Sequence, residues 1–217
     1  MINGGDHWDF EALCSYDKGK ASFHGRAYKK DVDAGLEFQE RLFEPIKRTK
    51  KKQPRKVFLF GNHEHRLERV LQYQPELEGT IGFKDLDLEK YYNDVVPYEG
   101  ATPGRIEIDG VIYAHFFVSG VKGLPVGGVN PARMLLQKQH TSSTSFHLHL
   151  VDWAVETTGN NKKIMGLFAG VGHDRTEEFA GASSHLWWPG VIVKKNVEQG
   201  VYDPEFISLK SLEKEYG

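Results

Sequence analysis

The chain has 217 residues with a net charge of −2 at pH 7, and 39% of the residues are hydrophobic. This is an ordinary globular composition, which excludes disordered and fibrous architectures, and the near-neutral charge gives no overall signal for nucleic-acid binding. The single cysteine, Cys14, excludes an internal disulfide and a zinc site built from cysteines. No apolar run approaches the roughly 18 residues that would span a membrane, and no basic-then-apolar leader opens the chain. We therefore expect a cytoplasmic protein without a membrane partner.

Strand and helix patterns alternate over the first half of the chain, and strands dominate the second. Apolar spacing, glycine breaks and turn residues predict a strand end at 2–6, a helix over 31–50, a buried strand over 57–60, a helix over 64–73 and a hairpin over 105–115. The same criteria then predict a glycine-rich loop over 120–128, a short helix over 131–139 and strands over 144–150, 151–157 and 163–169. This order favours a layered α/β domain with two sheets, and we treat residues 1–217 as a single domain.

Polar side chains that can bind a metal ion follow several of these strands. They occur in Gly5-Asp6, in Gly61-Asn62-His63-Glu64, at His115 and in His147-Leu148-His149. A strand end is a rigid place to mount a catalytic group, and the last two histidines share one side if their segment is extended. A carboxylate, an amide oxygen and imidazoles together suit Mn, Fe or Zn.

This ordered series resembles that of the calcineurin-like metallophosphoesterases. The family carries Asp-x-His, Gly-Asp, Gly-Asn-His-Asp/Glu, a lone His and Gly-His-x-His in that order, and this chain matches the last four blocks over residues 5–149. Phe146 stands where the family has the glycine of its last block. The resemblance implies a four-layer α/β/β/α sandwich of two mixed sheets flanked by helices.

The resemblance also implies a function and a role for each matching residue. The function is metal-dependent hydrolysis of phosphomonoesters or phosphodiesters by a metal-activated hydroxide, as in a phosphatase or phosphodiesterase. His63 is the implied catalytic residue, which contacts the scissile phosphate and assists the leaving group. The implied ligands of a divalent transition metal (Mn, Fe or Zn; two ions in a complete site) are Asp6, Asn62, His115, His147 and His149.

The family's Asp-x-His block has no counterpart here, because only four residues precede Gly5. The first strand of the domain would be missing with it, and one metal would keep only Asp6 and His149. Three explanations stay open: a fragment of a longer gene product, which we favour, a degenerate protein with one metal or none, or a homo-oligomer that fills the gap by strand exchange. His7, Asp9 and His65 lie close enough in sequence to serve as substitute ligands.

Two alternatives to a complete enzyme follow. One is a non-catalytic metal-binding or structural module, which the missing block favours and the presence of His63 opposes. The other is a DNA nuclease component, suggested by seven positive charges within residues 47–56. The substrate stays open between phosphomonoesters, nucleotides and nucleic acids, and Arg66, one helical turn after the Asn-His pair, is a candidate phosphate contact.

Overall fold

The structure is a computed structural model that describes residues 1–177 and 180–217. Their contacts form two compact units, Met1–Gly104 (unit 1) and Arg105–Gly217 (unit 2), and each is described by itself. Both combine helices with sheets, so the predicted α/β class is confirmed. That residues 1–217 form one domain stays a prediction. Among the described residues, no helix has both the length and the apolar character needed to cross a membrane.

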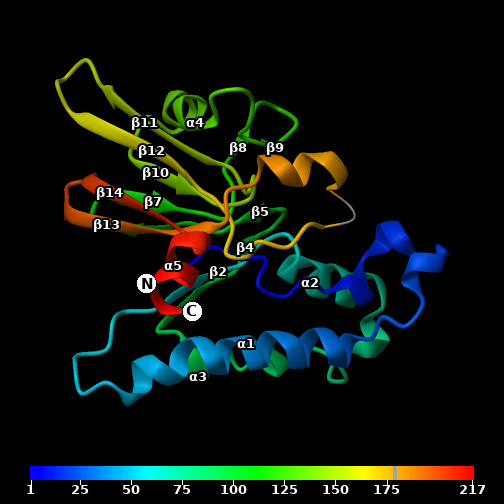
Figure 1. The fold of residues 1–217 in the computed structure, drawn as a ribbon. Coiled ribbons are helices and arrows are strands. Elements are labelled where there is room, and N and C mark those ends of the chain that lie inside the picture. Colours follow the sequence, from blue (N-terminus) through cyan, green and yellow to red (C-terminus); the bar gives the residue numbers. More distant parts are fainter. Residues whose placement is uncertain (178–179) are drawn as a thin grey trace. The chain divides into compact units, whose positions relative to one another are not determined.

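Unit 1 is built on a parallel three-stranded sheet with the strand order β1-β2-β3 (Figure 1). Its strands are β1 (Ile2–Asn3), β2 (Val57–Leu59), β3 (Asp94–Val96) and the short hairpin of β4 (Tyr98–Glu99) and β5 (Thr102–Pro103). Its helices are α1 (Tyr28–Arg48), α2 (Glu64–Tyr73) and α3 (Leu88–Tyr91). Because β1 and β2 are parallel, the segments that follow them, which begin with Gly4 and Phe60, start at the same edge of the sheet.

Aromatic side chains fill the core of unit 1. Trp8, Phe10, Phe43 and Phe58 are buried together, and α1 contributes Phe43 from its apolar face. The helix passes very close to Trp8: a Cβ on Gly35 would lie 1.9 Å from the indole nitrogen. Glycine at this position therefore lets α1 and Trp8 pack in direct contact.

Unit 2 is built on a five-stranded mixed sheet with the strand order β11-β12-β10-β7-β6. The three central strands are parallel and the two edge strands are antiparallel to their neighbours. The sheet contains β6 (Ile106–Ile108), β7 (Val111–Tyr113), β10 (Ser143–Ser145), β11 (Val151–Thr157) and β12 (Lys163–Ala169). The other elements are β8 (Val118–Ser119), β9 (Leu124–Pro125), α4 (Pro131–Gln139), the antiparallel ribbon of β13 (Gly190–Glu198) and β14 (Val201–Ser208), and α5 (Leu209–Tyr216).

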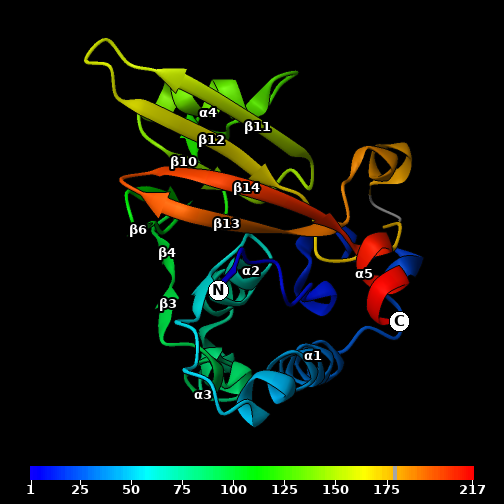
Figure 2. The ribbon, with the colours of Figure 1, turned by 60° about the vertical axis from the view of Figure 1, so that its left-hand side comes forward.

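The sheet of unit 2 is covered on both faces, by α4 on one and by the β13–β14 ribbon on the other (Figure 2). On the helix side, a Cβ on Gly166 would lie 2.4 Å from the carbonyl oxygen of Ala132, so α4 approaches β12 closely. On the ribbon side, the sulfur of Met165 accepts the backbone N–H of Tyr202 at 3.3 Å. Adjacent residues of β12 thus face opposite layers, as the pleat of a strand requires.

Most predicted elements are present, with small shifts at their ends. The helix predicted over 31–50 runs from Tyr28 to Arg48, and the helix over 64–73 and the Asp109-Gly110 hairpin are confirmed. The strand predicted over 144–150 is wrong beyond Ser145, where the chain turns. No prediction covered β3 or the β13–β14 ribbon, because short or charge-rich strands lack a clear alternation of apolar and polar residues.

Candidate functional site

Asp6 is held in a strained conformation just beyond β1. Its φ is 54°, in the left-handed region, and the preceding Gly5 has φ 91°. A Cβ on Gly5 would lie 2.5 Å from the backbone nitrogen of Gly61, so the loops after β1 and β2 touch through their backbones. A non-glycine residue with positive φ costs free energy and often marks a functional position. The Asp6 carboxylate is held in place from the loop after β2, because its Oδ1 accepts the backbone N–H of His63 at 2.9 Å.

A second carboxylate, Glu64 at the start of α2, holds this loop in place. Its side chain is fully buried, with 0% of its surface exposed. Its two oxygens accept the backbone N–H groups of Asp6, His7, Trp8 and Gly61 at 2.7–3.0 Å. Burial and the nearby charge of Asp6 raise the pKa of Glu64, while the backbone donors oppose this rise. Four donors on two oxygens stabilise the ionised form, so we assign Glu64 as an anionic clamp of the site loop.

His63 lies between two carboxylates. Its Nδ1 is 2.8 Å from Asp9 Oδ1, its Nε2 is 4.0 Å from Asp6 Oδ2, and its backbone N–H donates to Asp6 Oδ1 at 2.9 Å. Burial lowers the pKa of His63, but the charge of Asp6 and the hydrogen bond to Asp9 outweigh burial, so the pKa is raised above its ordinary value. Since an ionised carboxylate only accepts hydrogen bonds, Nδ1 donates to Asp9.

Asp9 also binds Arg66 of α2. The Arg66 Nη1 donates to the Asp9 carbonyl oxygen at 2.7 Å and lies 3.4 Å from Oδ1. Burial raises the pKa of Asp9, but the contacts with His63 and Arg66 outweigh it, so the pKa is lowered. Asp9, considered above only as a substitute ligand, is thus the residue that orients His63. The sequence signal was its distance of three residues from Asp6, which is weak by itself.

The other two substitute ligands have other partners. Both ring nitrogens of His7 are engaged, Nδ1 with the side-chain amide of Asn3 at 3.2 Å and Nε2 with the carbonyl of Gly35 at 3.0 Å. His65 stacks on Tyr98 with ring centroids 4.1 Å apart, and its Nδ1 contacts Glu68 at 3.1 Å. Asn62 is half-buried in the turn between β2 and α2. Because β1 and β2 are parallel, Asp6, Asn62 and His63 all lie in segments that begin at the same edge of the unit 1 sheet.

The three remaining predicted ligands belong to unit 2. His115, which follows β7, is buried, and its Nε2 lies 3.2 Å from Nδ1 of His147, which follows β10. The two residues are tied together through the backbone, since the carbonyl of His115 accepts the N–H groups of Phe146 and His147 at 2.9 and 3.0 Å. The structure therefore brings this predicted pair together with two ring nitrogens facing each other.

His149 lies in a different environment from the one predicted. Its φ is 60°, so the segment is not extended, and the prediction that His147 and His149 share one side of a strand is wrong. The turn is closed by the His149 N–H, which donates to the carbonyl of Phe146 at 3.1 Å. The imidazole packs edge-on against Trp187 with centroids 4.4 Å apart, and His173 lies 6.4 Å away. His149, like Asp6, is thus a candidate ligand with a left-handed backbone.

Comparisons with known proteins add no relative to this picture. No family model, no curated protein and no solved structure matches the chain.

Proposed function

We propose that this chain is a metal-dependent phosphoesterase that hydrolyses phosphomonoesters or phosphodiesters. The observation that carries the proposal is the grouping of Asp6, His63 and Asp9 beyond the ends of the parallel strands β1 and β2. A carboxylate with a fixed direction lies beside an imidazole that a second carboxylate orients. This is the arrangement expected for a metal ligand next to a proton-transfer group.

The donor atoms fit a transition metal. We propose that Asp6, Asn62, His115 and His147 hold one divalent ion, and that His149 with Asp6 binds a second ion more weakly. Support comes from the facing ring nitrogens of His115 and His147, because imidazole and carboxylate donors suit Mn, Fe and Zn. When bound, such an ion places positive charge next to phosphoryl oxygens and lowers the pKa of a bound water. The four-layer α/β/β/α sandwich of two mixed sheets flanked by helices is the fold that we propose with this function.

His63 acts on the leaving group in this proposal. Asp9 accepts a hydrogen bond from Nδ1 of His63, so Nε2 is the ring nitrogen that contacts the substrate. The protonated imidazole donates to the leaving oxygen, and the carboxylates of Asp6 and Asp9 favour this protonated form in the free protein. Arg66, which binds Asp9, keeps the orienting carboxylate ionised and in place.

The test is hydrolysis of p-nitrophenyl phosphate and bis(p-nitrophenyl) phosphate by the purified chain, with metal content measured by elemental analysis. We expect activity with Mn²⁺ that EDTA abolishes and added Mn²⁺ restores. Activity unchanged by EDTA would overturn the metal proposal. Bound metal without hydrolysis of either ester would overturn the catalytic proposal and favour the non-catalytic module.

A further inference from the structure

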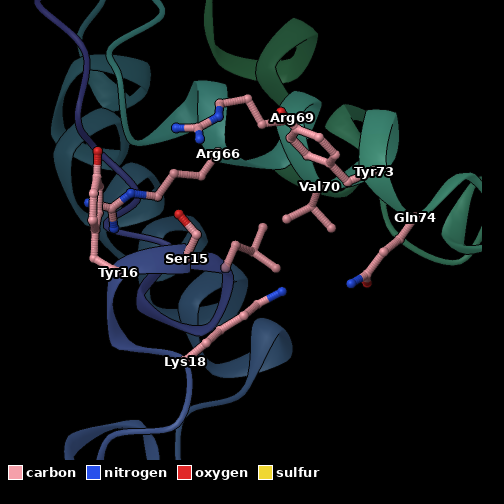
Figure 3. A pocket seen from close by; sticks show the side chains of 9 residues that line it. Ser15, Tyr16, Lys18, Arg66, Arg69, Val70, Tyr73 and Gln74 are labelled. Atoms are coloured by element: carbon pink, nitrogen blue, oxygen red, sulfur yellow. The ribbon is translucent and has the colours of Figure 1, made fainter.

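A pocket with basic and aromatic walls lies in unit 1 next to the His63 cluster (Figure 3). Its chemistry comes from five side chains, which we call the Tyr–Arg pocket: Arg66, Arg69 and Tyr73 from α2, and Tyr16 and Lys18 from the facing segment. The cavity measures about 130 Å³. That is well below the roughly 300–1,000 Å³ of pockets that enclose a whole drug-sized ligand. The pocket therefore suits one moiety of a longer molecule.

The pocket carries positive charge that the described residues do not neutralise. Within residues 1–177 and 180–217, neither Lys18 nor Arg69 makes an ion pair or a side-chain hydrogen bond. The carboxylate next to Lys18, Asp17, is already paired with Lys20 at 3.0 Å and Arg26 at 2.8 Å, and the carboxylate next to Arg69, Glu68, contacts the ring of His65 at 3.1 Å. Two cations thus remain for an anionic ligand, and phosphate is the common biological group that pairs with Arg and Lys.

Two tyrosines flank these cations and are almost fully open to solvent. Tyr16 is 78% and Tyr73 80% exposed. Large aromatic side chains left exposed beside cations form the usual surface for stacking nucleobases, because every base offers a π-face and every nucleotide a phosphate. The same pair of features gives no advantage to a simple sugar phosphate, which has no base to stack.

Arg66 connects the pocket to the proposed chemistry. It lines the pocket, its Nη1 lies 3.4 Å from Asp9 Oδ1, and that same oxygen lies 2.8 Å from Nδ1 of His63. A ligand in the pocket is therefore separated from the proposed catalytic histidine by two side chains. A subsite for the group next to a scissile phosphate must lie this close to the catalytic residue, so that binding there positions the phosphate for reaction.

We propose that the Tyr–Arg pocket binds a nucleotide unit adjacent to the phosphate that is hydrolysed, with Lys18 and Arg69 on its phosphate and Tyr16 or Tyr73 on its base. This inference rests on the proposed phosphoesterase function and names nucleotides as its substrate class. The unit can come from a free nucleotide or from a single strand of nucleic acid.

Binding is measured without catalysis, so that the inference and the proposed function can fail separately. In EDTA, a fluorescein-labelled oligothymidylate of eight nucleotides is titrated with the full chain, and AMP and unlabelled strand compete. We expect Tyr16→Ala/Lys18→Ala and Arg69→Ala/Tyr73→Ala each to weaken binding about ten-fold and to reduce its salt dependence. Lys210→Ala/Tyr216→Ala removes one lysine and one exposed tyrosine from α5 and serves as the matched control.

Each outcome decides the inference. Selective weakening in the pocket variants supports it, with AMP competition marking a free-nucleotide site and strand-only competition marking a nucleic-acid site. Equal affinity in all variants, or no binding of strand or AMP by the parent, overturns it, even if bis(p-nitrophenyl) phosphate is hydrolysed. Selective weakening without any hydrolysis would instead remove the proposed function and leave the binding site. Circular dichroism melting confirms that the variants, all at exposed positions, are folded.

Discussion

The carboxylate of Glu64 accepts the backbone N–H of Asp6 at 2.9 Å, and the carboxylate of Asp6 accepts the backbone N–H of His63 at the same distance. The loops after β1 and β2 therefore fix each other through their acidic side chains. Because Glu64 is the residue after His63, one short segment carries the proposed catalytic group and also holds the loop that contains Asp6.

We expect Glu64→Gln to destabilise the protein by about 2–4 kcal/mol. An amide offers one acceptor oxygen where four N–H groups now converge on two, and each buried donor left unpaired costs roughly 1–3 kcal/mol. Urea unfolding measures the change. Glu68→Gln, one turn further along α2, is the control. Among the described residues, the Glu68 carboxylate forms a hydrogen bond with the ring of His65 and does not hold the loop after β1. Equal stability of the two variants would contradict the clamp.

His63→Ala should lower turnover by roughly 10²- to 10⁴-fold and leave metal content unchanged. This is the usual size of a general acid–base contribution, and His63 is not a proposed ligand. Turnover and elemental analysis are measured on the same preparation, with the exposed His24→Ala as control. Loss of metal would make His63 a ligand, and full activity would remove it from the mechanism.

Asn62→Ala should act on the metal itself. The side-chain amide is a proposed but neutral ligand, so we expect weaker retention of the ion during dialysis rather than an empty site. The fold should be preserved, because Asn62 is only half-buried at a loop. Metal retention equal to that of the parent would exclude Asn62 from the ligand set.

After dialysis the parent should retain about one ion per chain, and His147→Ala should retain almost none. His149→Ala should keep the tightly bound ion, because the ring of His149 packs on Trp187 while His147 faces His115. The reverse pattern, with metal lost in His149→Ala and kept in His147→Ala, would show that the tight site is built on His149.

Lys194 should make stability depend on pH. It lies over the rings of Tyr113 and Tyr202 and donates to the hydroxyls of Tyr113 and Thr144. Burial lowers its pKa from 10.5 to about 7. The folded protein therefore releases this proton near pH 7, whereas the unfolded chain holds it to about 10.5. The contribution of Lys194 to stability is least favourable below pH 7 and improves as the pH rises through this window.

Lys194→Met should therefore stabilise the protein near pH 6. The depressed pKa corresponds to a destabilisation of the folded protein by the buried cation of roughly 5 kcal/mol at most. The substitution removes this cost but also removes the hydrogen bonds of Lys194, so we expect the free energy of unfolding to rise by about 2 kcal/mol. The gain should shrink as the pH approaches 10. Chemical unfolding at pH 6, 8 and 10 gives the comparison, and a difference independent of pH would show that Lys194 is not buried as a cation.

The positions of Asp6, Asn62 and His63 could be predicted because a short apolar strand followed by glycine marks its own end in the sequence. The pairing of His115 with His147 could also be expected, since each follows a strand of the same sheet. The role of Glu64 could not, because three of the four N–H groups that it accepts belong to residues 56–58 positions away in the sequence. Nor could the left-handed backbone of His149, which depends on a local turn that the alternating pattern Ser145-Phe146-His147-Leu148-His149 conceals.

The close approach of Gly35 to Trp8 gives the protein an internal optical probe. Trp8 is 1% exposed, and the other three tryptophans, Trp153, Trp187 and Trp188, all lie in unit 2. With those three replaced by phenylalanine, the fluorescence comes from one indole enclosed by α1 and the aromatic core. Its emission wavelength then follows the unfolding of unit 1 alone, independently of the β-rich part of the chain.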